Sequence, residues 1–212
     1  MGKLISLSER LAERSSERGI TARGRAAFFF ALDCPLSYLV AERMERDFGQ
    51  IAWVPMLSPS DPRRARERFF RTLSIAAGAG MPLIEPENFP FDPKPVTRGA
   101  VFAAAQGAGA GFAVAAMRLT FAGGFDLSDP DVIAEAAAAA GLSAEEVLTA
   151  SQDPGNDTAL ASVGRGLVRR GVAEAPVMRI DGGWFSGLDA LAQTTEFTAA
   201  RASYHAQLNN LA

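Results

Sequence analysis

Strand-forming segments lie near both ends of this 212-residue chain, and a long helical stretch separates them. Residues 26–32 form a continuous apolar run, AAFFFAL, whose length and aromatic content are typical of a strand buried on both faces. A second strand is predicted at 51–54, and a hairpin at 177–186 with Asp181-Gly182-Gly183 as its turn. Residues 61–170 show only helical patterns. This order predicts one α/β sheet with a helical insertion.

The same pattern divides the chain into an N-terminal helical extension (1–25), the first half of the sheet domain (26–60), the helical insertion (61–170) and the second half of the sheet domain (171–212). Ser6 and Glu9 form a capping-box pair, which predicts a surface helix over 6–18. Within the insertion, two further capping boxes are predicted, Ser128 with Asp131 and Ser143 with Glu146.

Composition excludes several classes of function. The net charge of −3 and the pI of about 5.3 argue against a general nucleic-acid binder. The N-terminus lacks the apolar stretch of a signal peptide, and the run at 26–32 is too short to span a bilayer. We therefore expect a cytoplasmic protein with no membrane partner. One cysteine and one histidine allow no internal disulfide and make no zinc site of the usual kind, so no metal is expected.

The single cysteine occupies a position where thiols can be reactive. Asp33-Cys34-Pro35 follows the first strand, and Pro35 suits the first position of a helix. The free N–H groups and the dipole at a helix start stabilise a thiolate, which predicts a pKa for Cys34 below the ordinary value of about 8.5. Asp33 is expected to be a solvated turn residue, and the alternative is that it points at the sulfur and raises the pKa of the thiol. The alternative is that Cys34 is a small, buried and inert side chain.

Three stretches of the chain resemble a known family. The segment from Phe28 to Leu39, FFFALDCPLSYL, is similar to the opening strand and Ser-Pro-x-Ser-Tyr motif of the 2-hydroxychromene-2-carboxylate isomerases and kappa-class glutathione transferases. The segment GVAEAPV at 171–177, with Asp181-Gly182 and FSGLD at 185–189, resembles the family's closing segment. Similar stretches also occur at 80–90 and 121–126, so the resemblance covers roughly residues 26–200.

This resemblance implies a thioredoxin fold interrupted by helices, as in DsbA, with its two halves at 26–60 and 171–212. It further implies that Pro176 is a cis-proline facing the Cys34 helix start and that the backbone of Ala175 meets a thiol ligand. Asp189 matches a residue that holds the γ-glutamyl end of glutathione, with Leu188 beside it. The alternative role for Asp189 is a simple helix N-cap.

The motif Cys34-Pro35-Leu36-Ser37 differs from the active-site motifs of two related groups of enzymes. In the isomerases and kappa transferases a serine at the position of Cys34 supports the thiolate of glutathione, whereas dithiol oxidoreductases of the superfamily carry Cys-x-x-Cys. Here Cys34 is the expected catalytic residue, and Ser37 joins Ala175, Pro176, Leu188 and Asp189 as an expected ligand-binding residue. Because no second thiol exists to close a disulfide, a dithiol cycle is excluded.

Three functions remain open. We favour a glutathione-dependent isomerase or transferase-like enzyme acting on a small aromatic or unsaturated acid, with glutathione or another low-molecular-weight thiol as cofactor. A monothiol thiol–disulfide oxidoreductase and a non-catalytic binding protein are the alternatives. A homodimer is left open.

The helical insertion is predicted to cover the Cys34 helix start and to wall a substrate cleft with Phe89, Phe91 and Phe112. A cluster of arginines is expected to form one solvated face, with the rim of an acidic substrate's entrance as the alternative: Arg63, Arg64, Arg66 and Arg68.

Overall fold

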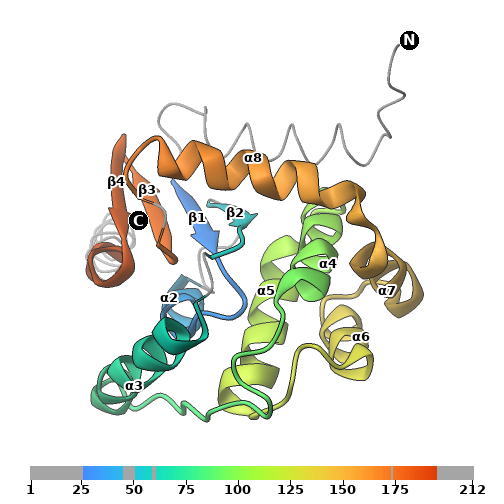
Figure 1. Cartoon of the computed structure of the whole chain (residues 1–212), viewed down its shortest axis with the longest axis horizontal. Helices are drawn as coiled ribbons and strands as arrows, with labels where there is room; N and C mark the ends of the chain where they lie inside the picture. The colour runs from blue at the N-terminus through green and yellow to red at the C-terminus, as the bar shows by residue number, and fades with distance from the viewer. Residues whose placement is uncertain (1–25, 45–50, 59–60, 173, 195–212) are drawn as a thin grey trace, which may run out of the picture.

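The computed structural model describes residues 26–44, 51–58, 61–172 and 174–194. The helix expected over 6–18 lies outside these ranges. Within them, the chain forms one four-stranded sheet accompanied by helices (Figure 1). The predicted α/β class is confirmed.

The sheet joins both ends of the described chain. Its strands are β1 (Ala27–Phe30), β2 (Ala52–Pro55), β3 (Val177–Ile180) and β4 (Gly183–Ser186), in the order β2-β1-β3-β4. β1 is parallel to β2 and antiparallel to β3, so Phe29 lies opposite Val54 on one side and Val177 on the other. All four residues of β1 are buried, as the unbroken apolar run predicts.

The hairpin between β3 and β4 closes through a tight turn. Asp181 and Gly182 both have positive φ, 48° and 85°, which is the backbone that two-residue hairpin turns require. Gly183 is already paired with Ile180 and belongs to β4 rather than to the turn.

Within the described residues, one helix lies between β1 and β2, and the interval between β2 and β3 is helical, as the sequence predicts for residues 61–170. The helices are α2 (Pro35–Met44), α3 (Pro62–Gly78), α4 (Lys94–Ala105), α5 (Gly109–Met117), the π-helical turn η2 (Arg118–Ala122), α6 (Pro130–Ala139), α7 (Ala144–Gln152), the 3₁₀ turn η3 (Pro154–Asn156) and α8 (Asp157–Val168). Residues 187–194 are helical as well. Figure 1 shows α8 running along one side of the molecule, from α7 back towards the sheet.

Two of the predicted helix caps can be compared with the structure. Ser143 is the N-cap of α7, where its hydroxyl accepts a hydrogen bond from the Glu146 N–H at 3.4 Å. The prediction of Ser128 as the cap of α6 is wrong. Asp129 caps that helix by accepting from the Asp131 N–H, because Pro130 occupies the first helical position and moves the start by one residue.

One hydrophobic core connects the sheet with the helical insertion. It runs from the buried rings of β1 through Met44 and Met56 to Phe112 and Phe121 in the insertion. The helical stretch therefore packs on the sheet rather than forming a separate core. Among the helices in the described ranges, none is both long and apolar enough to cross a membrane.

Candidate active site

Cys34 lies directly before the first residue of α2, at the point where β1 gives way to the helix. Its carbonyl accepts hydrogen bonds from the N–H groups of Ser37 and Tyr38, which makes Cys34 the N-cap of α2. The side chain is 1% exposed. The helix-start position predicted for this thiol is therefore observed, but its sulfur is enclosed.

The thiol faces the segment that precedes β3. Cys34 Sγ donates a hydrogen bond to the carbonyl oxygen of Ala175 at 3.4 Å, across 141 residues of sequence. The following Ala175–Pro176 peptide bond is cis, as the family resemblance implies. The structure thus brings together Cys34, Ala175 and Pro176.

Ser37 is fully buried one turn into α2. Its hydroxyl oxygen accepts a hydrogen bond from the Ala31 N–H at 3.2 Å, which ties the helix to the end of β1. Its backbone N–H and its hydroxyl also act on Cys34, where both lower the pKa of the thiol. Ser37 therefore positions the cysteine within this site.

Burial dominates the electrostatics of the thiol. The pKa of Cys34 is raised, first because burial disfavours the thiolate and further because the charge of Asp33 lies nearby. The hydrogen bonds from Ser37 and the charge of Arg68 oppose this change but do not overcome it. The direction is opposite to the one expected from the helix start, because desolvation outweighs the dipole. Cys34 is therefore a protonated hydrogen-bond donor at neutral pH.

Asp33 is buried, and the expectation of a solvated turn residue is wrong. It is 2% exposed, and its Oδ1 has no hydrogen-bond partner within the described residues. Burial raises the pKa of this carboxyl to about 6, while the nearby charge of Arg68 and the backbone N–H of Asp33 lower it. Asp33 therefore places a carboxyl group that titrates close to neutrality beside the thiol.

The side chain of Arg68 is far less exposed than those of Arg63 and Arg64 on the same helix. The side chains of Arg63 and Arg64 are exposed, which fits the predicted solvated face. The Arg68 side chain is only 10% exposed, and its Nε and Nη2 have no hydrogen-bond partners within the described part of the chain. Its Nη1 lies 3.9 Å from Glu174 Oε1. A buried guanidinium with free donors is a group that can receive an anion.

A hollow of about 200 Å³ opens next to this cluster. Leu36 from α2 lies on one side of it, and Arg68 and Arg71 from α3 on another. Glu174 and the residues from Ser186 to Asp189 complete its lining. The hollow therefore touches both halves of the sheet domain, and it carries two positive and two negative side chains.

Leu188 and Asp189, which the sequence analysis gave as expected ligand-binding residues, both line this hollow and are exposed. The helix over 187–194 begins at Gly187, two residues before Asp189. Asp189 is therefore in the first turn of the helix, and its alternative role as the N-cap is wrong. Asp189 is one of the residues that line the hollow.

The aromatic wall predicted for the cleft is not found there. Phe89, Phe91 and Phe112 are buried in the core, and none of them lines the hollow. Phe89 packs against Phe69 and Phe91, with ring centroids 5.5 and 6.2 Å apart. These rings support the loop before α4 instead.

The sequence reasoning singled out neither Arg71 nor Glu174, and it did not separate Arg68 from its neighbours. The only available signal was spacing. Arg64, Arg68 and Arg71 lie on one side of α3. Phe69 and Thr72, which follow Arg68 and Arg71 in sequence, are buried in the core. The sequence alone does not show which arginine faces the thiol.

The fold and this site define a class: a thioredoxin-type domain in which a cysteine directly precedes helix α2 and contacts the segment that carries a cis-proline. Residues 26–198 match the family described as the DSBA-like thioredoxin domain. The chain belongs to this family.

Solved structures agree with this fold. A 2-hydroxychromene-2-carboxylate isomerase aligns with a TM-score of 0.64 at 15% identity, covering 88% of this chain and 98% of that one. The cytosolic disulfide reductase DsbM from Pseudomonas aeruginosa aligns with a TM-score of 0.64 at 18% identity, covering 89% and 100%. A thioredoxin-like oxidoreductase from Silicibacter pomeroyi DSS-3 gives 0.53 at 14% identity, covering 86% and 88%. No curated protein matches the chain in sequence. At these identities the neighbours establish the fold alone.

Proposed function

We propose that this chain is a glutathione-dependent isomerase or transferase-like enzyme acting on a small aromatic or α,β-unsaturated carboxylic acid. The observation that carries the proposal is the pairing of a buried thiol, which donates a hydrogen bond to the Ala175 carbonyl, with an adjacent hollow lined by charged groups of both signs. Such a thiol serves as a hydrogen-bond donor, and such a hollow suits a ligand that brings charges of its own.

The charges of the hollow match those of glutathione. Glutathione carries two carboxylates and one ammonium group at neutral pH. Arg68 and Arg71 would bind a carboxylate, and Glu174 and Asp189 would bind the ammonium group. The cis segment at Ala175 would offer its backbone to the peptide, as the family resemblance implies. Glutathione is therefore the cofactor that we propose, in a cytoplasmic protein.

The proposed reaction is reversible addition of the external thiol. Asp33, whose Oδ1 has no partner within the described residues, takes the proton of the glutathione thiol. The Cys34 S–H then turns from the Ala175 carbonyl to the resulting thiolate and stabilises it. The thiolate adds to the β-carbon of the unsaturated acid, and the π electrons move towards the carbonyl. Rotation about the new single bond and expulsion of the thiolate then give the isomer, and Asp33 returns its proton to the expelled thiolate. No electrons are gained or lost overall.

A monothiol oxidoreductase is the second candidate, and the presence of sulfur where the isomerases carry a serine hydroxyl favours it. In that reaction the Cys34 thiolate attacks a disulfide, a mixed disulfide forms, and the other thiolate leaves. An outside thiol must then release Cys34, because the chain has no second cysteine. The enclosed sulfur and its raised pKa argue against this candidate.

Two measurements separate the candidates. Intact mass after incubation with oxidised glutathione reports a mixed disulfide, and calorimetry reports binding of reduced glutathione. The isomerase proposal expects no mass increase in the folded wild type, retained binding in Cys34→Ser, and weaker binding in Cys34→Ala, which has no donor. A rapid gain of one glutathione that Cys34→Ser abolishes would instead establish the oxidoreductase. If neither the wild type nor a variant bound reduced glutathione, the third function, a non-catalytic binding protein, would be favoured.

A matched pair of arginine variants tests the hollow itself. Arg68→Gln removes a buried charge with free donors and should weaken glutathione binding about tenfold, since a charge-assisted hydrogen bond is worth about 1.5–3 kcal/mol. Arg64→Gln removes an exposed charge from the same helix and should leave binding unchanged. Equal effects would show that only the net charge of α3 matters.

A further inference from the structure

A second cavity lies in the helical insertion, between α4 and α7. Its volume is about 530 Å³, more than twice that of the hollow beside Cys34. Figure 1 shows α7 on the opposite side of the molecule from β3 and β4, so this cavity is remote from the thiol. Cavities of about 300–1,000 Å³ are of the size that binds small molecules.

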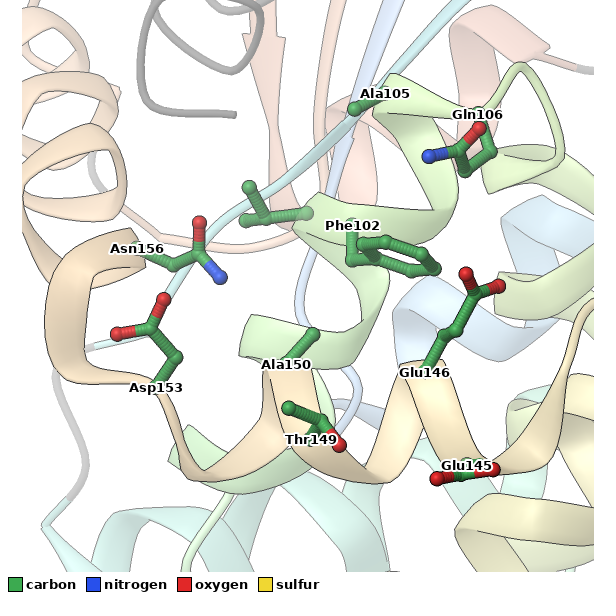
Figure 2. A pocket seen from close by; sticks show the side chains of 10 residues that line it. Phe102, Ala105, Gln106, Glu145, Glu146, Thr149, Ala150, Asp153 and Asn156 are labelled. Atoms are coloured by element: carbon green, nitrogen blue, oxygen red, sulfur yellow. The ribbon is translucent and has the colours of Figure 1, made fainter. Parts of the chain in front are cut away.

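The floor of the cavity is apolar. Val101 and Ala105 come from α4, and Ala150 comes from α7. Between them stands the half-buried ring of Phe102, which Figure 2 shows projecting from α4 across the space towards α7. The floor therefore offers a flat aromatic face and small side chains that leave room beside it.

The rim of the cavity is acidic. Glu145, Glu146 and Asp153 contribute carboxylates, and no basic side chain is part of the lining. Neither glutamate forms an ion pair within the described residues. Arg98, one turn before Phe102 on α4, forms a salt bridge with Asp157: its Nε and Nη2 donate to the two carboxylate oxygens at 2.8 and 2.9 Å. The charge of Arg98 also acts on Asp153, so within the described residues the rim carboxylates without an ion pair or a nearby cation are those of Glu145 and Glu146.

Asn156 supplies an independent sign of a ligand. It is 7% exposed and precedes α8, but its side chain makes no capping hydrogen bond and has no other partner within the described part of the chain. Figure 2 shows its amide directed into the cavity from the side opposite Glu146. The amide atoms face the open cavity, where a bound molecule can form the hydrogen bonds that the described residues do not supply.

We propose that this cavity binds a small organic cation with a flat apolar body, of the arylalkylamine class. The apolar body stacks on Phe102 and covers Val101 and Ala150. The ammonium group faces the carboxylates of the rim, where the ring of Phe102 also attracts a cation. The amide of Asn156 bonds to a polar group at the other end of the ligand. The site is separate from the thiol centre, and this proposal does not depend on the function proposed for Cys34.

Tryptamine is a suitable probe, with indole-3-propionate as an anion of similar shape and spermidine as a cation without an apolar body. Binding is followed by amide chemical shifts in the full-length protein. The expected result is saturable binding of tryptamine, with shifts at Phe102 and Asn156, and at least tenfold weaker binding of the other two probes. Equal binding of indole-3-propionate would overturn the role of charge. Equal binding of spermidine would reduce the site to a non-selective acidic surface. No binding, or shifts confined to the Cys34 hollow, would overturn the site.

Paired variants isolate the rim. Glu145→Gln with Glu146→Gln removes two charges from the first turn of α7 and should weaken tryptamine binding about tenfold. Asp131→Asn with Glu135→Gln removes the same charge from α6, outside the cavity, and should change the affinity less than twofold. Equal losses in the two double variants would overturn the proposal. Unfolding curves show whether each variant is folded, and Asn156→Ala provides a further variant that leaves the charge unchanged and should also weaken binding.

Discussion

At the scale of single residues, the site depends on charges that are enclosed with incomplete partners. Asp33 and Arg68 are both buried, act on each other's charge, and each retain free hydrogen-bonding atoms. A buried polar group without a partner lowers stability, so these residues reduce the free energy of unfolding. Their position beside Cys34 is consistent with selection for chemistry at the site rather than for stability.

Asp33 should make the protein less stable as the pH rises from about 4 to 6. Its pKa is about 6 in the folded chain against 3.8 as an ordinary carboxyl, so between these values the folded state holds a proton that the unfolded state has lost. The associated stability is present below pH 4 and is lost through pH 6. At about 1.4 kcal/mol per pKa unit, the loss reaches roughly 3 kcal/mol.

Urea unfolding of the wild type and Asp33→Asn across pH 3.5–7.5 measures this effect. The difference between the two free energies of unfolding should change with pH only in the window from 4 to 6. Glu135→Gln, which removes an exposed carboxyl on α6, is measured alongside as the matched control for the loss of one carboxyl. Parallel curves for the wild type and Asp33→Asn would show that Asp33 titrates normally.

At the scale of elements, the starts of helices place the functional groups. α2 begins at the thiol, and the helix over 187–194 begins at the mouth of the hollow. β4 leads directly into the second of these helices, and a four-residue turn joins β1 to α2, so the sheet fixes where each first helical turn lies. The π-helical turn η2 extends α5, and its Arg118 binds both carboxylate oxygens of Glu42 on α2 at 2.6 and 2.8 Å.

Asp189→Asn should weaken glutathione binding about tenfold. The carboxylate lines the hollow, and replacing it removes a charge-assisted hydrogen bond to the ligand ammonium. The variant should also lose a few tenths of a kcal/mol of stability, because an acid in the first helical turn favours the dipole. Asp131→Asn, in the first turn of α6, carries the same helix effect without contact with the hollow. Calorimetry on both variants separates ligand binding from helix stability.

Gly109→Ala should destabilise the fold by about 1–3 kcal/mol. A Cβ at Gly109 would lie 2.9 Å from Ala104 Cα and 3.0 Å from Ala104 Cβ, and both atoms belong to the adjoining helix α4. Gly164→Ala, within α8, would meet no atom within 4 Å and should stabilise by about 0.5–1 kcal/mol. Thermal unfolding of the two variants should therefore move in opposite directions. A shift in the same direction would show that α4 and α5 can separate.

At the scale of the whole molecule, the sheet and the helical insertion share one core. Buried side chains connect β1 with α5 and α6 without a gap, and Arg98 of α4 is bonded to Asp157 of α8. An insertion that folded alone would need its own closed core. The division of the sequence into segments therefore describes the order of the chain and not a set of independent units.

The protein should unfold in one cooperative transition. Calorimetry should give one peak, and circular dichroism in the far and near ultraviolet should give coincident melting curves, since separate units would melt separately. An earlier loss of helical signal, with the tertiary signal of Trp53 and Trp184 near the sheet retained, would show that the insertion melts on its own.

Much of the architecture could be predicted from the sequence because it depends on local patterns. The apolar run of β1, the tight hairpin turn at Asp181-Gly182 and the helix start after Cys34 each follow from a few adjacent residues. The resemblance to a known family added the cis bond at Pro176 and placed Asp189 near the site. Helix boundaries were less certain, as Asp129 and Gly187 show, because neighbouring polar residues compete for the same cap.

The burial of charged groups was decided by the tertiary structure. From the sequence, Asp33 is predicted to be a turn residue and Arg68 to be one of several surface arginines. Their neighbours in sequence do not indicate that these two side chains will be buried. The packing of α3 against α2 encloses both, and desolvation then raises the pKa values of Asp33 and Cys34. The cavity between α4 and α7 arises in the same way, from helices whose contacts are distant in sequence. Sequence determines local conformation, whereas the dielectric environment of a side chain depends on every element that packs around it.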